Sequence, residues 1–311
     1  MSRLDPEKRI IVGGPEAGTR RVLIAFVIFT ALATNELLGF TDDTDEFFAW
    51  HIRAEPTAAF LGAAYASGLV LSVLALRQDR WSRIRVAMVT VTAFTVLTAI
   101  ATIIHLHLFH LTSGGPPARF AAWLWLAVYF LIPAACLAVV VRQERGHRRS
   151  EAVHQPIPGW LMALLGAQGA ILFLAGVVLY AGGATRHHTP KGWTAFWPLP
   201  LAPMTSLAVG AWLIAFGFAA AMALWERDLS RLFVPAVAYT VFGVLQLSVV
   251  LWYRTEVTVD GWLWAYVVLL VTIVAAGGYG WWAAQRAAAA AGSEPTEASR
   301  SRVVLSDESP G

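Results

Sequence analysis

Eight long runs of apolar residues divide this chain and limit what it can fold into. They cover residues 22–40, 56–76, 86–105, 120–141, 159–181, 204–225, 232–253 and 261–283. A helix needs about 20 apolar residues to cross the hydrocarbon core of a bilayer, which is roughly 30 Å thick. Because the runs are continuous and do not alternate in hydrophobicity, they favour helices over the strands of a membrane barrel. We therefore expect an all-α polytopic membrane protein with eight transmembrane helices.

The composition points to lipid as the solvent of this chain. Only 14% of its residues are charged and 57% are hydrophobic, which leaves too few polar side chains to cover a water-soluble domain. The lipid bilayer is therefore the expected partner, together with a membrane protein partner or a second copy of the chain. The net charge of +3 is explained by membrane topology, so no nucleic acid partner is expected.

The distribution of Lys and Arg predicts the orientation. If the N-terminus is cytoplasmic, 18 of the 23 basic residues fall in the cytoplasmic segments, and the outer segments hold five, namely Arg53, Arg119, Arg186, Lys191 and Arg254. Basic residues stay on the cytoplasmic side during insertion, so both termini are predicted to be cytoplasmic. Abundant Ala, Arg and Gly with little Lys are typical of a GC-rich bacterial source, which indicates the plasma membrane.

The two halves of the chain resemble each other when the sequence is shifted by 148 positions. The shift aligns Thr57 with Thr205, Gly62 with Gly210, Thr98 with Gln246 and His105 with Tyr253. An even number of spans in each copy leaves both copies with the same orientation, related by an axis along the membrane normal. The sequence thus predicts two parallel four-helix repeats.

The predicted repeats set the domain boundaries. The first repeat covers residues 21–142 and the second covers 158–286, with a cytoplasmic linker over 143–157. Residues 1–20 are expected to be a cytoplasmic tail, and residues 287–311 a disordered one, because neither has an apolar face to bury.

Polar residues within or beside the apolar runs are the candidates for function. Glu36 lies 14 residues into the first run, about 21 Å along the helix, and a charge inside a membrane is costly unless it faces the bundle. His105 lies about 29 Å along the third run, at its outer edge. A stripe of threonines on the same helix face leads to His105; it either packs against a neighbouring helix or lines a cavity.

These residues predict an outward-facing polar pocket in the first half. We expect it to contain Glu36 and His105 and, from neighbouring segments and the second repeat, Asn35, His51, Arg53, Glu55, Gln246 and Tyr253. The alternative is a solvated acidic loop with an aromatic anchor. A further alternative is a metal site formed by His105, His107 and His110, although the glycines and prolines that follow His110 predict that the helix ends there.

Three classes of function stay open at this point. Parallel repeats and an internal polar track favour a carrier or permease of unknown substrate. A non-transporting subunit or scaffold of a larger complex is the alternative. The chain has no phosphate-binding loop, zinc-protease helix, nucleophile elbow or cysteine pair, so it is not expected to drive transport with ATP by itself, and whether it is an enzyme stays open.

The third class is a haem- or metal-dependent redox enzyme. The stretch "EFFAWHIR", Glu46 to Arg53, and the arrangement of eight spans in two parallel halves resemble the haem A synthases. That resemblance implies haem held by paired histidines on facing spans of each half, and a Glu-x-x-His-Arg-like motif at the outer end of an early span. Here the motif has a different spacing, and the second half has histidines only in a loop, at His187 and His188. No cofactor is therefore assigned.

Overall fold

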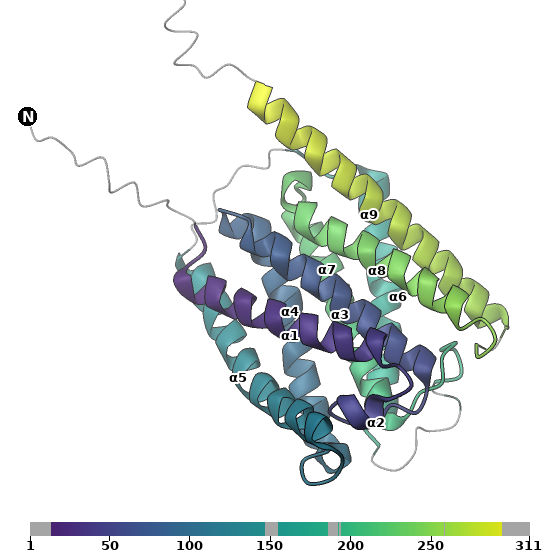
Figure 1. Ribbon diagram of the computed structural model, residues 1–311. Coiled ribbons are helices and arrows are strands. Elements are labelled where there is room, and N and C mark those ends of the chain that lie inside the picture. The colour runs from purple at the N-terminus through teal and green to yellow at the C-terminus, as the bar shows by residue number, and fades with distance from the viewer. Residues whose placement is uncertain (1–13, 147–154, 186–191, 193, 258, 294–311) are drawn as a thin grey trace, which may run out of the picture.

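The computed structural model describes residues 14–146, 155–185, 192, 194–257 and 259–293, which form a bundle of long helices (Figure 1). Eight of the helices in this part of the chain are long and apolar enough to cross a membrane. They are α1 (Ala17–Gly39), α3 (Glu55–Leu76), α4 (Trp81–Ile104), α5 (Pro116–Gly146), α6 (Gly159–Gly183), α7 (Pro203–Glu226), α8 (Phe233–Trp252) and α9 (Gly261–Ser293). The prediction of an all-α polytopic membrane protein is confirmed at this level.

The outer surface of the bundle has the composition expected of a surface that faces lipid. Large apolar side chains point outward along the helices, among them Ile28, Phe120 and Leu131, each more than half exposed. Exposed tryptophans such as Trp225 and Trp262 lie near the helix ends, where aromatic rings anchor a protein at the membrane surface. Such a surface would be unfavourable in water.

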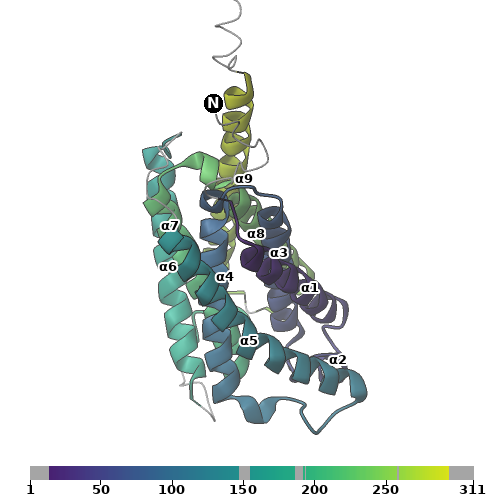
Figure 2. The same ribbon diagram turned by 90° about the vertical axis from the view of Figure 1, so that its left-hand side faces the viewer.

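Several helices extend beyond their apolar runs: α1 and α4 each begin five residues earlier, and α5 and α9 are extended further. Helix α5 begins at Pro116, because proline suits the first turn of a helix. It changes direction along its length (Figure 2), and Pro133, which lies in its interior, cannot donate a backbone hydrogen bond there. Helix α9 continues from residue 286 to Ser293 through a run of alanines, the strongest helix formers. Residues 294–311 and 1–13 of the expected tails lie outside the described residues, as does the linker segment 147–154.

The eight long helices form two layers of four (Figure 1). One layer has the order α1, α3, α8, α9, and the other has the order α5, α4, α7, α6. Each layer therefore takes two helices from the first half of the chain, residues 17–146, and two from the second half, residues 159–293. The shift of 148 positions pairs α3 with α7 and α4 with α8. The contact of α3 with α8 in one layer therefore corresponds to the contact of α7 with α4 in the other, and an exchange of the two halves would exchange the two layers.

Glycines permit close helix contacts in both halves. A Cβ atom on Gly62 of α3 would lie 2.7 Å from the Leu38 side chain of α1. A Cβ atom on Gly210 of α7 would lie 2.8 Å from both the carbonyl oxygen of Gly176 and the backbone nitrogen of Tyr180 in α6. Gly62 and Gly210 are the residues that the 148-position shift aligns, and each lies where the first two long helices of its half cross.

Short elements close the two ends of the bundle. We call the end where α1 begins the N-terminal face and the other end the opposite face. At the opposite face, the loop that contains α2 (Thr44–Phe47) meets the loop after η1 (Leu106–Leu108) through a β-bridge between Trp50 and Phe109. At the N-terminal face, η2 (Leu229–Arg231) joins α7 to α8.

Candidate binding site between the two halves

The residues predicted to form an outward-facing pocket have different environments at the opposite face. Asn35, His51 and Arg53 are exposed, whereas Glu36 and Glu55 are partly buried. None of these five makes a side-chain hydrogen bond or an ion pair within the part of the chain that the structure describes. The structure therefore shows them near one end of the first half without joining them into a hydrogen-bonded network.

His105, Gln246 and Tyr253, the buried members of the predicted pocket, bind across the boundary between the halves. His105 is fully buried, and its Nε2 donates to the carbonyl oxygen of Gly183 at 2.8 Å. Tyr253, its partner in the repeat alignment, donates to Oγ1 of Thr41 at 3.1 Å. The first bond joins α4 to the end of α6, and the second joins α8 to the residues after α1. These two polar residues therefore hold the halves together at the same place in each.

Gln246 serves a similar structural purpose in the middle of α8. It is fully buried, and its Nε2 donates to the carbonyl oxygen of Phe60 in α3 at 3.0 Å. Its Oε1 accepts from the Tyr266 hydroxyl at 3.3 Å. Both ends of the amide are therefore occupied by protein groups.

The threonine stripe of α4 packs against α5. Thr95, Thr98 and Thr102 are buried. Thr102 donates to the carbonyl oxygen of Thr98 at 2.8 Å and accepts from the indole nitrogen of Trp125 at 2.9 Å. Small polar residues commonly bring membrane helices together in this way. Of the two alternatives for the stripe, the structure favours packing over the lining of a cavity.

The three outer histidines have different environments. The rings of His105 and His107 lie 5.8 Å apart, and His107 is exposed. His110 is partly buried, and its backbone nitrogen donates to the carbonyl oxygen of Ala49 at 3.0 Å. Burial lowers the pKa of His110 below its ordinary value; His51 lowers it further, and Asp45 opposes the shift. Among the described residues no three His, Cys, Asp or Glu side chains lie together as a group that could hold a metal ion.

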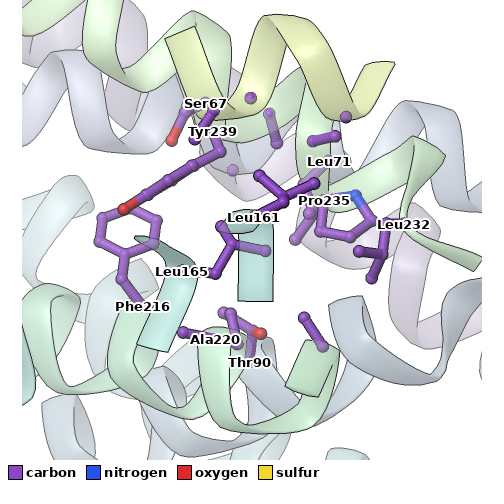
Figure 3. A pocket seen from close by; sticks show the side chains of 18 of the residues that line it. Ser67, Leu71, Thr90, Leu161, Leu165, Phe216, Ala220, Leu232, Pro235 and Tyr239 are labelled. Carbon is purple, nitrogen blue, oxygen red and sulfur yellow. The ribbon is translucent and has the colours of Figure 1, made fainter. Parts of the chain in front are cut away.

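An apolar cavity lies between the two halves, toward the N-terminal face (Figure 3). Its volume is about 80 Å³. Figure 3 shows the lining side chains around an open space, with Phe216, Ala220 and Thr90 on one side and Leu232 and Pro235 on another. The wall takes residues from α3 and α4 of the first half and from α6, α7, α8 and α9 of the second half. Six of the eight long helices therefore contribute to this wall.

The cavity exists because much of its wall consists of small residues. Alanine and glycine occupy most of the positions that face it on α7 and α9, including Ala219, Ala223, Ala276, Gly277 and Gly280. The sequence signal for this site is the run "AFGFAAAMA" in α7 and "AAGGYG" in α9. Small residues also occur wherever membrane helices pack closely, so this signal alone does not distinguish a cavity from a tight contact.

A buried set of charged residues lies next to the cavity wall at the N-terminal face. We call Arg85, Glu144, Glu226, Asp228 and Arg231 the ionic clasp. Arg85 of α4 binds Glu144 of α5, and its Nη1 lies 3.0 Å from Oε1 of Glu226 at the end of α7. Arg231 reaches the other oxygen of Glu226 at 2.5 Å and Oδ2 of Asp228 at 3.4 Å.

The ionic clasp joins the halves, because the Glu226 carboxylate binds one arginine from each. The side chain of Glu226 is only 2% exposed. Ala223 and Leu232, which line the cavity, flank the Glu226–Arg231 segment in sequence. Nearby, the backbone nitrogen of Leu229 donates to the carbonyl oxygen of Gln155 at 2.8 Å, so the end of the linker also closes over this region. Charged groups that bind one another therefore lie next to the cavity wall at this face.

No family model, no curated protein and no solved structure matches this chain.

Proposed function

We propose that this protein is a membrane carrier of the permease type, which binds its substrate in the cavity between its two halves. One observation carries the proposal: the cavity is lined by helices of both halves, so a movement of one half against the other changes its shape and its exposure. Binding sites at the interface between repeats, with alternating access produced by rocking of the halves, are typical of secondary transporters.

The packing of the helices supports a carrier built from a duplicated four-helix unit. The contact between α3 and α8 has its equivalent in the contact between α7 and α4. Gly62 and Gly210 lie at equivalent crossings, and His105 and Tyr253 make equivalent bonds across the halves. We infer that the two units descend from one gene segment and move as two bodies.

The ionic clasp and the hydrogen bonds at the opposite face supply the two closures that alternating access needs. The Glu226 carboxylate fastens the halves on the N-terminal side of the cavity, while the His105 and Tyr253 bonds fasten them on the other. A carrier releases one set at a time. Breaking the ionic clasp should therefore favour a conformation that is open toward the N-terminal face.

Distances between spin labels test this movement. Cys136, the single cysteine, is replaced by alanine, and label pairs are placed at Arg83 with Arg227, or at His107 with Ala184, all of them exposed. We expect Glu226→Gln to add a longer Arg83–Arg227 distance while the His107–Ala184 distance does not lengthen.

The matched control for this experiment is an exposed ion pair away from the cavity. Glu16 binds Arg142 at 3.2 Å with both side chains well exposed, so Glu16→Gln should leave both distance distributions as they are. If both label pairs keep one unchanged distance in wild type and in Glu226→Gln, the halves do not rock. The carrier proposal then falls, and the non-transporting subunit or scaffold becomes the better hypothesis.

Location and orientation belong to the same proposal. We place the protein in the plasma membrane with the N-terminal face toward the cytosol, as the excess of basic residues on that side favours. A reporter fused after Gly311 should be active only in the cytosol, and activity outside the cell would reverse the orientation.

The outward-facing polar pocket stays a separate prediction. Its key residue is Glu36, which is partly buried within α1. Glu36→Gln should impair transport while leaving the protein folded, and unimpaired transport would remove Glu36 from the mechanism.

A further inference from the structure

We propose that the cavity binds an apolar, lipid-soluble molecule that carries a hydrogen-bond acceptor such as a ketone, ester or quinone carbonyl, and that the indole N–H of Trp212 recognises this acceptor. The inference rests on the proposed function in its choice of site, but it concerns the ligand and not the movement of the halves.

The wall of the cavity selects an apolar molecule. Nearly all of its surface comes from apolar atoms of Ala, Gly, Leu, Pro, Phe and Trp residues. Its hydroxyl groups already use their hydrogens within the protein: Ser67 donates to the carbonyl oxygen of Ala64 at 2.8 Å and Thr90 to that of Val86 at 2.7 Å. The Tyr239 hydroxyl donates to Oε1 of Gln168 at 3.4 Å. A polar or charged solute would lose its hydration here without gaining comparable partners.

Trp212 is the exception in this wall. It is 4% exposed, and its Nε1 finds no hydrogen-bond acceptor within the described part of the chain. Buried donors are nearly always paired, because leaving one unpaired costs about 1–3 kcal/mol. The indole forms part of the cavity wall, and its Nε1 is covered by neighbouring side chains in this conformation. We infer that an acceptor on a bound molecule reaches the N–H when these neighbours shift to admit it. A purely hydrocarbon ligand would leave the N–H unpaired.

Packing fixes the position of the Trp212 ring. The indole stacks on Phe94, with ring centroids 3.9 Å apart, and contacts Tyr65 edge-on at 5.4 Å. It also lies across Gly68, where an added Cβ would be 3.1 Å from its Cη2 atom. A donor held in this way is preorganised, so it can select a ligand without a cost in side-chain entropy.

The surroundings of the cavity indicate that the ligand arrives from the membrane. The ionic clasp lies on the N-terminal side, with charges that bind one another. On the lipid side, α6 packs along α7, α9 packs along α8, and α6 and α9 meet at few positions, among them Trp160 and Tyr279. An engineered cavity of about 150 Å³ holds a benzene-sized guest. The present volume of about 80 Å³ is therefore enough for one end of an apolar chain.

Binding of two matched compounds tests the inference. The full chain in nanodiscs is titrated with a long-chain methyl ketone and with the alkane of the same carbon number, and the Kd of each is measured. We expect wild type to bind the ketone about fivefold more tightly than the alkane, the ratio that one additional neutral hydrogen bond provides. Trp212→Phe, which removes the N–H and keeps an aromatic ring, should bind the two compounds equally.

Two further variants control the experiment. Trp50 is also buried with an unpaired Nε1 among the described residues, but it lies at the opposite face and does not line the cavity. Trp50→Phe should therefore retain the fivefold preference. Ala276→Leu fills the cavity and should weaken the binding of both compounds at least tenfold. A ketone preference that survives in Trp212→Phe overturns the role of the indole, and unchanged binding in Ala276→Leu overturns the site.

The two proposals fail separately. If the ketone preference depends on Trp212 but the spin-label distances never change, the proposed ligand class is supported and the carrier proposal is refuted. If the distances change as expected but neither compound binds, the carrier stands and this ligand class is wrong.

Discussion

Replacing Gly210 by alanine tests the close contact between α6 and α7. This contact in the second half is equivalent to the contact between α1 and α3 in the first half. The added Cβ would lie 2.8 Å from the carbonyl oxygen of Gly176 and from the backbone nitrogen of Tyr180. Both atoms belong to the backbone of α6, which cannot move aside as the end of a side chain can. The two helices must therefore separate where they cross, and contacts along α6 and α7 are lost with them.

The magnitude follows from a comparison with Gly278, a helical glycine of α9. Alanine at Gly278 meets nothing within 4 Å, so it should stabilise the protein by about 1 kcal/mol through helix propensity alone. Alanine at Gly210 receives the same benefit, but the overpacked contact costs about 1–3 kcal/mol. Propensity cancels in the comparison, so Gly210→Ala should be less stable than Gly278→Ala by about 1–3 kcal/mol.

Unfolding in mixed micelles of increasing SDS content, followed by far-UV circular dichroism, measures the difference. Gly62→Ala, at the equivalent crossing, clashes with the Leu38 side chain, which can shift, as well as with the Leu37 backbone at 3.0 Å. It should therefore cost less than Gly210→Ala. If Gly210→Ala and Gly278→Ala differ by less than about 0.5 kcal/mol, the close approach of α6 and α7 is not an energetic constraint and the argument is refuted.

Three other predictions concern the polar groups. Glu226→Ala leaves two arginines of the ionic clasp without their shared carboxylate and should destabilise the protein by about 3–5 kcal/mol. Replacing the exposed Glu16 by alanine should cost less than about 1 kcal/mol in the same unfolding assay. Equal costs for the two variants would contradict this prediction. Gln246→Leu removes the acceptor of the buried Tyr266 hydroxyl and should cost about 1–3 kcal/mol, and a neutral effect would show that the hydroxyl finds another acceptor. Because the pKa of His110 is lower in the folded protein than in the unfolded chain, the folded state binds that proton less readily, and the loop around it should lose stability as the pH falls below about 6.5. Hydrogen exchange at the amides of this loop should then quicken in wild type, and a His110→Gln variant with the same pH dependence would argue against the assignment.

The eight apolar runs were sufficient to predict the helices, since a backbone in lipid must satisfy its own hydrogen bonds and a helix does so within one segment. The alignment of Gly62 with Gly210 likewise came from the sequence, because a glycine at a close helix crossing can be recognised when it recurs at a fixed spacing. The threonine stripe on α4 was also predicted from its helical period. Whether it faced a cavity or a neighbour depended on α5, which lies elsewhere in the sequence.

The hydrogen-bond partners of His105 and Gln246 could not be predicted from the sequence in the same way. A polar residue in an apolar run must find a partner, but the partners here are carbonyl oxygens of Gly183 and Phe60, and every residue has a carbonyl. The count of basic residues places Arg85 and Arg231 in loops but says nothing of their burial or of their acidic partners, so the ionic clasp could not be predicted from it.

The sequence by itself determined that this chain suits lipid, how many of its helices are long and apolar enough to cross a membrane and which stretch of the chain forms each of them, because hydrophobicity and length are properties of local segments. Only the tertiary structure decided that six helices from both halves leave an apolar space and that Trp212 borders it with an unpaired donor. A cavity remains where the side chains of neighbouring helices do not fill the space between them. Which side chains face one another depends on how separate helices pack.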